Sequence, residues 1–457
     1  MVVLGLAIAW IGGVAVAVLD GRRRSVAWAA VGILAAHVAA LAVLLGLVLA
    51  DGPRETVAGS WPVGVGIRLR ADALGALFAV VSASVLLMAL VHETAAGINA
   101  RRTPALILLL GAGLSGLFLT GDVFSFYVFF ELAMISAYAL TATGGSSRQL
   151  GAAFIFAVVN LLGSFMFLIG IGALYHVTGS LDMAIVADRM SEVDPSSGTL
   201  IAVTIFVAFC IKLGLFPFHF WLPAVYCSAR PAVAAILSGA LANIGAYGLL
   251  RFGAGILPAE LNLASGALAV LGTASILYGA LQAVSRRTLN EVLAYSAIGQ
   301  AGYILIALSV GGPIGLFAAV LYAVVNALNK ALLFLSIDVG GWFVGAAFAL
   351  GAFSVAGVPP SAGFFGKVGL FQSGIEQGSA ALVALIFLGG ALSFVYMFQI
   401  YQIAFWRPNT DRARLPSGRL HRAPAFTCAA GVLCLGLWPE PLLAVSERAA
   451  AVLGAGG

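Results

Sequence analysis

The chain has 457 residues, of which 62% are hydrophobic and only 9% are charged, with a net charge of +5. A soluble domain carries roughly 25% charged residues, so this composition leaves too little polar surface for a soluble protein. It also excludes an intrinsically disordered chain, because such chains are poor in hydrophobic residues. The composition therefore predicts an all-α integral membrane protein with many spans, in which 56 glycines would allow close helix packing.

Apolar runs long enough to cross a bilayer as helices, about 20 residues each, recur along the whole chain. We predict fourteen transmembrane helices, at about 1–19, 25–50, 71–93, 103–120, 122–142, 149–177, 199–222, 230–252, 265–284, 289–310, 313–338, 342–373, 379–405 and 424–446.

Arginines are distributed unevenly between the two alternating sets of loops. Fourteen lie in the set at about 20–24, 94–102, 285–288 and 406–422 and in two shorter loops, and six lie on the other side. Loops rich in basic residues stay in the cytoplasm. We therefore expect these loops to be cytoplasmic and both termini to lie outside, in a multi-pass protein of the cell inner (plasma) membrane.

Lysine is used differently from arginine in this chain. There are only three lysines, Lys212, Lys330 and Lys367, and each interrupts a long apolar run. A buried lysine can lose its proton, whereas arginine effectively cannot. This division predicts that protons are exchanged inside the bilayer.

The loops are too short to hold a soluble domain, so nucleotide binding and cytosolic catalysis within this chain are not expected. Gly111, Gly113 and Gly116 match a dinucleotide-binding motif, but they lie inside a span without a preceding strand, which predicts helix packing instead. The four cysteines have no metal or disulfide spacing, and the five histidines are too scattered to suggest a metal cluster. We expect no cofactor and no metal.

An acidic residue, Glu131, lies in the middle of the run at 122–142. A charge at the bilayer centre costs at least about 2.5–3.5 kcal/mol on insertion scales. Tyr127 and Tyr138 lie one turn before it and two turns after it, on the same helix face. We interpret Glu131 as a buried carboxylate that is paired with a cation; the alternative is a protonated carboxyl group that only packs.

Two of the lysines lie beside prolines within a span. Pro217 follows Lys212, and Pro360 precedes Lys367. Proline lacks a backbone donor, so both helices should be discontinuous there, and broken helices at membrane depth line protein or a water-filled cavity. We expect ion sites at both lysines; the alternative is a lysine in a structural salt bridge. His219 lies near the end of its run and belongs to the candidate path unless it faces the interface.

Further polar residues follow helical spacing at mid-membrane depth. Lys330 ends a stripe that also contains Tyr322 and Asn326, with Asn329 beside it. Other runs carry Ser275, Tyr278 and Gln282; Ser296, Gln300 and Tyr303; and Asn243, Tyr247 and Arg251. A single polar residue in a membrane helix is usually packing glue. Polar faces on six helices instead predict a hydrated file that carries protons, driven by an ion gradient or by another subunit.

The two broken helices are the seventh and twelfth runs, five apart. A repeat of five helices inverts its topology, and inverted repeats with broken helices are typical of secondary transporters. We expect an N-terminal part at 1–102, repeats at 103–252 (helices 4–8) and 265–405 (helices 9–13), and a cytoplasmic loop with a C-terminal helix at 406–457.

These residues resemble a known family, the antiporter-like subunits shared by respiratory complex I and the Mrp-type multisubunit cation/proton antiporters. The resemblance covers helices 4 to 13 and rests on five segments: Phe124–Leu140, Lys212–Pro223, Leu293–Ile304, Lys330–Leu335 and Val358–Lys367. Details at 363–378 and 403–406 look most similar to the Mrp D subunit.

The resemblance implies a proton-translocating subunit of a multisubunit cation (Na⁺)/proton antiporter, with other membrane subunits as partners and the lipid bilayer around it. Glu131 would control the protonation of Lys212, Lys330 would relay protons, and Lys367 would connect the path to one side or to a neighbouring subunit. The chain would be a transport subunit and not a catalytic one; nucleic acid is not expected as a partner.

The sequence also departs from the family pattern. Asn243 stands where the family often has lysine or histidine, and Tyr322 and Asn326 stand where it often has histidine. An asparagine cannot change its charge, so it can only hold water in line. Either the proton path runs on fewer titratable groups, or the chain is a structural paralogue with reduced conduction. A separate alternative is a proton-pumping subunit of an NADH-quinone oxidoreductase or membrane hydrogenase complex.

Overall fold

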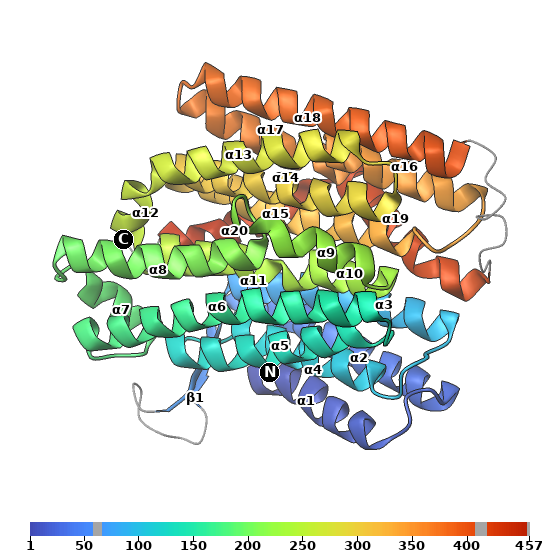
Figure 1. Cartoon of the computed structure of the whole chain (residues 1–457). Coiled ribbons are helices and arrows are strands. Elements are labelled where there is room, and N and C mark those ends of the chain that lie inside the picture. Colours follow the sequence, from blue (N-terminus) through green and yellow to red (C-terminus); the bar gives the residue numbers. More distant parts are fainter. Residues whose placement is uncertain (58–65, 407–417, 455–457) are drawn as a thin grey trace.

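Helices make up nearly all of the described chain, which comprises residues 1–57, 66–406 and 418–454 of the computed structural model. Figure 1 shows the long helices lying side by side, with the first half of the chain (blue to green) below the second half (yellow to orange). The late helix α20 lies between the two halves in this view.

The first half contains α1 (Val2–Val18), α2 (Arg24–Asp51), β1 (Arg54–Val57), β2 (Arg68–Ala71), α3 (Ala73–Ala96), α4 (Thr103–Phe118), α5 (Val123–Ala142), α6 (Ser147–Thr178), α7 (Met183–Met190), α8 (Pro195–Leu213), η2 (Phe218–Phe220), α9 (Trp221–Ser228), α10 (Pro231–Ile236), η3 (Leu237–Leu241), α11 (Asn243–Gly248) and η4 (Leu249–Ala254). The second half contains α12 (Pro258–Leu263), α13 (Ser265–Ser285), α14 (Leu289–Val310), α15 (Gly312–Leu335), α16 (Trp342–Ala356), α17 (Ala362–Glu376), α18 (Ala380–Tyr401), η5 (Gln402–Trp406), α19 (Arg419–Leu437) and α20 (Glu440–Gly454).

Eleven helices of the described chain are long and apolar enough to cross a membrane. Three shorter apolar helices, α1, α4 and α16, coincide with three of the fourteen expected runs but have only 17, 16 and 15 residues. The chain is therefore an all-helical membrane protein, as its composition predicts.

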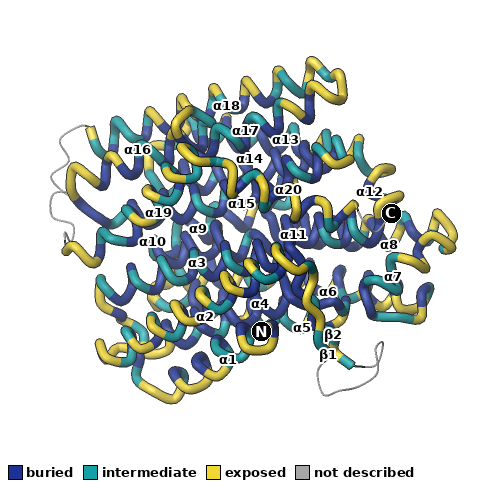
Figure 2. The backbone as a smooth tube through the Cα atoms, turned by 180° about the vertical axis from the view of Figure 1, so that it is seen from behind, coloured by how far each residue is buried: buried dark blue, intermediate teal, exposed yellow. Residues whose placement is uncertain are grey.

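The outer helices expose large hydrophobic side chains, and Figure 2 shows exposed residues in yellow along α18. Phe154 on α6 and Phe387 on α18 are each 70% exposed. By contrast, α14, α15 and the segment from α10 to η4 are almost entirely buried. An apolar rim around a buried centre is what a helix bundle surrounded by lipid requires, because the lipid tails are as apolar as the side chains.

The two expected helix breaks are confirmed. α8 ends at Leu213, Gly214 adopts a left-handed conformation with φ +67°, and α9 begins only at Trp221. α16 ends at Ala356, and α17 begins at Ala362. Side chains satisfy backbone groups across both breaks, as buried helix ends require.

Trp221 Nε1 donates to the carbonyl of Ile211 across the first break at 3.0 Å. Across the second break, Ser354 Oγ accepts the backbone N–H of Gly363, also at 3.0 Å. Each break is thereby held in a defined geometry.

The expected single helix at 424–446 is wrong. The structure has two helices there, α19 and α20, with Trp438 in an extended conformation between them (φ −131°, ψ 80°). Pro439 causes the interruption, because it removes a backbone donor and disfavours helical geometry at the preceding residue. Both helices pack against α3 and α15.

A two-stranded antiparallel sheet between α2 and α3 also departs from a purely helical fold. β1 pairs with β2, with Arg54 opposite Ala71. Along β2, Leu69 and Ala71 are buried while Arg68 and Arg70, which alternate with them, are partly exposed. This is the alternation of a half-buried strand.

The glycine-rich stretch of α4 packs against α5, as predicted. A Cβ atom at Gly113 would lie 2.8 Å from the backbone nitrogen of Ala133. The glycines therefore allow the backbones of α4 and α5 to approach closely.

Candidate functional site

Lys212 is buried at the C-terminal end of α8, next to the first helix break. Its Nζ donates to the carbonyl oxygen of Asn160 at 2.8 Å and to Ser164 Oγ at 3.1 Å, both on α6. It also lies 4.1 Å from the ring centroid of Phe130 on α5. The site holds an ammonium group with polar partners, and none of the three contacts carries a full negative charge.

Glu131 lies on α5 beside this site but makes no direct ion pair with Lys212 among the described residues. Lys212, Tyr127 and Tyr138 all lie within electrostatic range of Glu131. The Glu131 Oε1 atom and the Tyr138 hydroxyl are buried without a hydrogen-bond partner in the described chain. The structure thus places Glu131 near Lys212, whose own hydrogen bonds go to α6.

Lys330 begins a connected set of polar side chains in the second half of the chain. It is fully buried on α15, and its Nζ donates to Ser296 Oγ on α14 at 2.9 Å. Ser296 Oγ lies 3.0 Å from the hydroxyl of Tyr396 on α18. Gln300 Nε2 donates to the same hydroxyl at 3.2 Å, and the Tyr322 hydroxyl donates to Gln300 Oε1.

We call this set of hydrogen-bonded side chains the Lys330 chain: Lys330, Ser296, Tyr396, Gln300, Ser393 and Tyr322, in which Ser393 Oγ accepts from Gln300 and Tyr396. Lys367 lies beside the far end of the Lys330 chain. Its Nζ is 3.2 Å from the ring centroid of Tyr303 and 5.5 Å from that of Tyr322. The Lys367 ammonium has no hydrogen-bond partner in the described chain. Hydrogen bonds therefore connect Lys330 to Tyr322. The Lys367 ammonium then lies against the rings of Tyr322 and Tyr303.

Other candidates lie outside the Lys330 chain. Asn243 donates to Ser82 Oγ on α3 at 3.0 Å, and the Tyr247 hydroxyl donates to the carbonyl of Phe118 at 3.1 Å. Tyr247 also accepts a hydrogen bond from Arg251 at 3.1 Å. The side chains of this stripe bond to α3 and to the end of α4, and not to any of the three lysines.

Three further candidates have few contacts. Asn326 is half-buried and makes no side-chain hydrogen bond among the described residues, and Asn329 Oδ1 is buried without a partner there. The His219 ring lies 4.3 Å from that of Tyr278 on α13, centroid to centroid. His219 therefore lies between the two halves of the chain.

Four polar residues of the site were not predicted from the sequence. Ser393 and Tyr396 on α18 join the Lys330 chain, and Asn160 and Ser164 on α6 bind Lys212. Both pairs follow helical spacing, three and four residues apart. The same polar-stripe signal that revealed Tyr322 and Lys330 could have found them.

A charged cavity of about 490 Å³ lies beside the N-terminal end of α5, the helix of Glu131. Arg68 donates to both carboxylate oxygens of Asp182 there, at 2.9 and 3.1 Å. Asp122 caps α5 by accepting the backbone N–H of Ser125, and burial raises the pKa of the Asp122 carboxyl group. The cavity could admit water and ions to this end of the helix.

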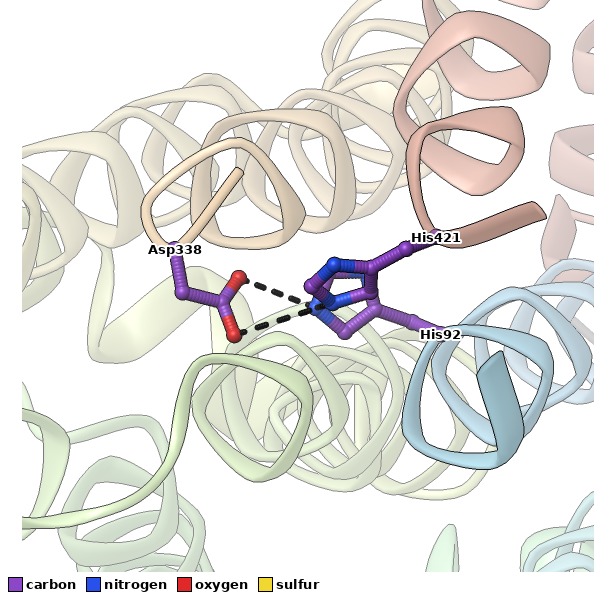
Figure 3. A group of neighbouring side chains, drawn as sticks. All are labelled: His92, Asp338 and His421. Atoms are coloured by element: carbon purple, nitrogen blue, oxygen red, sulfur yellow. Dashed lines mark hydrogen bonds and ion pairs between the residues drawn. The ribbon is translucent and has the colours of Figure 1, made fainter. Parts of the chain in front are cut away.

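A second polar cluster contradicts one expectation. His92, Asp338 and His421 each offer one possible ligand atom, and these three atoms all lie within 4.8 Å of one another (Figure 3). The sequence positions of the histidines suggested no metal cluster, but two of them meet in the fold. Their positions in the sequence are far apart, and only the packing of α3, α15 and α19 brings them together.

Comparisons with known proteins agree with this architecture. The family described as NADH:quinone oxidoreductase/Mrp antiporter, TM, matches residues 120–340. The N subunit of the NADH-quinone oxidoreductase of Desulforudis audaxviator is 34% identical, over 92% of this chain and 91% of that protein. The D subunit of the Na(+)/H(+) antiporter of Alkalihalophilus pseudofirmus is 30% identical, over 86% of this chain and 84% of that protein.

A solved structure of the Mrp complex from Dietzia sp. DQ12-45-1b contains a chain with the same fold. The TM-score is 0.90 at 27% identity, with 98% of this chain and 97% of that chain covered. The 34% and 30% sequence identities to these two subunits extend over 92% and 86% of this chain. The chain therefore belongs to the family of antiporter-like subunits of Mrp antiporters and NADH:quinone oxidoreductases.

Proposed function

We propose that the chain is the proton-translocating subunit of an Mrp-type multisubunit cation (Na⁺)/proton antiporter. The observation that carries this proposal is the Lys330 chain, which links a fully buried lysine on α15 to Tyr322 beside Lys367 through hydrogen bonds of 2.9–3.3 Å and the bond from Tyr322 to Gln300. Hydroxyl groups both donate and accept, so Ser296, Tyr396 and Tyr322 can pass protons. The Gln300 amide does not change its protonation; it holds the Tyr396 and Tyr322 hydroxyls in place, and water carries the proton between them.

The proton path has two parts in this proposal. Glu131 controls whether Lys212 is protonated, Lys212 exchanges the proton with the region around the first helix break, and Lys330 relays it toward Lys367. The polar groups between the parts are the backbone N–H of Phe216, which donates to Ser275 Oγ at 3.1 Å, and His219 beside Tyr278. Water joins the two parts.

The fold of the proposed subunit has fourteen spans and two inverted repeats of five helices, at 103–252 and 265–405. Each proposed repeat contains one interrupted helix with a lysine beside the break: α8 with α9 in the first repeat, and α16 with α17 in the second. The break falls on the fourth helix of each repeat, which supports the repeats. Asn243 and Tyr247 hold water along the path in this proposal, with their side chains bonded to Ser82 and to the carbonyl of Phe118.

Both termini lie outside in this proposal, and the loops with most arginines face the cytoplasm. The test is a set of single cysteines in a variant without native cysteines, at Arg101 and Arg286 for the cytoplasmic side and at Glu55 for the outside. We expect a membrane-impermeant maleimide to label only the Glu55 variant in intact cells and all three after lysis. Labelling at Arg101 in intact cells would reverse the assignment.

The partners are other membrane subunits, and the ions are protons and Na⁺. Purification of the natural complex should yield cation-antiporter subunits with this chain, and the complex in liposomes should exchange Na⁺ for protons. The chain by itself should not, because it is one subunit and the described residues form no complete Na⁺ site. Robust exchange by the chain alone would contradict the proposal.

The similarity to the N subunit of an NADH-quinone oxidoreductase supports a second candidate, a proton-pumping subunit that redox chemistry in partner chains would drive. The same purification separates the two candidates, since iron–sulfur and flavin subunits would accompany the chain only in a redox-driven complex. In either complex this chain holds the proton path and not the redox site.

A further inference from the structure

A cluster of two histidines and one aspartate lies apart from the proton path, where three distant segments meet (Figure 3). His92 comes from the end of α3, Asp338 follows α15, and His421 lies in the first turn of α19. We propose that these residues bind a transition-metal dication of the Zn²⁺ class, which fastens the three segments together.

The distances fit a shared cation. His92 Nε2 lies 2.9 Å from Asp338 Oδ1 and 3.0 Å from His421 Nε2, and His421 Nε2 lies 3.9 Å from Asp338 Oδ2. Ligand atoms at about 2.0–2.1 Å from a tetrahedral Zn²⁺ are about 3.3–3.4 Å apart. The measured separations bracket that value but involve both oxygens of Asp338; with one oxygen taken, the three ligand atoms all lie within 4.8 Å of one another. A rotation of the carboxylate with small movements of the two rings would place one oxygen and both nitrogens on one ion.

The chemistry of the donor atoms also favours a metal. Two imidazoles and a carboxylate are common Zn²⁺ ligands, and three protein ligands leave a fourth position for water. His92 Nε2 and His421 Nε2 lie 3.0 Å apart. At this distance only one of the two nitrogens can carry a proton, because the other must accept the hydrogen bond with its lone pair. A cation would instead use the lone pairs of both nitrogens and the carboxylate together.

The surroundings suit a cation that enters from the aqueous side. The His92 and His421 side chains are 2% and 4% exposed, whereas that of Asp338 is 35% exposed and gives access. Glu93 lies within electrostatic range of His92 and Asp338, and its own ion pair with Arg230, at 2.8 Å, offsets part of its charge. The site would therefore have two buried nitrogen ligands and one carboxylate at its mouth.

A metal here would restrain α15, the helix that carries Lys330. Asp338 and His92 are 246 residues apart in the sequence, and His92 and His421 are 329 apart. One ion would thus cross-link the N-terminal helices, the second half of the chain and the C-terminal helices. The inference does not depend on the transport function, because it concerns binding alone.

The test is metal uptake by the full-length chain without an affinity tag, stripped with a chelator in detergent. We expect one Zn²⁺ per chain, and Co²⁺ in its place should give the intense visible absorption of a tetrahedral site. His92→Gln, Asp338→Asn and His421→Gln should each weaken uptake at least about tenfold. The matched control is His176→Gln, at an exposed histidine on α6 that should leave uptake unchanged.

X-ray absorption of the zinc-loaded unmodified chain keeps the test decisive if a variant fails to fold. Imidazole and carboxylate ligation at one zinc would support the proposal. No uptake by the unmodified chain, or uptake that the three variants and the control share equally, would overturn it and leave a hydrogen-bonded cluster only.

Discussion

Replacing Lys330 with arginine should reduce proton transport by the reconstituted complex by about 100-fold, within the range that a positioned proton-transfer group contributes. Lys330 is fully buried and donates to Ser296 Oγ at 2.9 Å. Arginine keeps the positive charge but cannot release its proton. Histidine at the same position is titratable near neutral pH, so Lys330→His should retain a measurable part of the activity.

The hydroxyl of Tyr396 provides a second measure of the same path. Tyr396→Phe keeps the ring but removes the oxygen that contacts Ser296, Gln300 and Ser393. We expect a loss of roughly tenfold, equivalent to about 1.4 kcal/mol in the barrier. The matched control is Tyr175→Phe, at a tyrosine that is 54% exposed on α6.

The measurement is proton flux into liposomes that contain complexes of equal subunit composition, which shows that each variant assembles. Equal activities of the arginine and histidine variants would mean that Lys330 is a fixed structural cation. Full activity of Tyr396→Phe would mean that protons bypass the Lys330 chain.

The second prediction concerns Glu131 and Lys212, which interact through space without direct contact. Glu131→Gln removes a negative charge that favours the ammonium form of Lys212. The lysine then releases its proton at lower pH, so the pH profile of transport should move toward acid. We expect roughly one pH unit, the low end for a neighbouring opposite charge.

A double-mutant cycle makes this prediction specific. Lys212→Ala leaves the Glu131 carboxylate buried without its cation, and Glu131→Gln leaves the ammonium without its carboxylate. The double variant should therefore lose less activity than the sum of the two single losses, because a lone buried charge costs more than none.

Transport by the reconstituted complex is measured against pH for the four members of the cycle, with Glu192→Gln as the control at an exposed acidic residue. Additive losses with an unshifted profile would show that the two residues act independently. The proposed control of Lys212 by Glu131 would then fail.

Local sequence patterns revealed much of the structure. Pro217 and Pro360 predicted the two helix breaks beside Lys212 and Lys367, because proline acts on its own backbone whatever surrounds it. Spacing of four residues placed Tyr322 and Lys330 on one face of α15, because helical geometry is the same in any protein. The same rule applied to Pro439 would have divided the last helix correctly.

Contacts between helices could not be predicted in the same way. Glu131 was interpreted as the partner of a cation, but the sequence did not show that Lys212 donates to Asn160 and Ser164 on α6. The partner of Asn243, Ser82 on α3, could not be predicted either. A polar residue on a membrane helix shows that a partner is needed and does not show which neighbouring helix provides it.

By itself, the sequence determined that this is a helical membrane protein, where most spans lie, which two helices break and which three lysines are buried. Those features depend on residue type and on separations of a few residues along one helix. Only the tertiary structure decided that Tyr396 completes the Lys330 chain and that His92 meets Asp338 and His421. Their partners lie on other helices, up to 329 residues away, and such pairs form only when helix packing sets the rotation and depth of each helix.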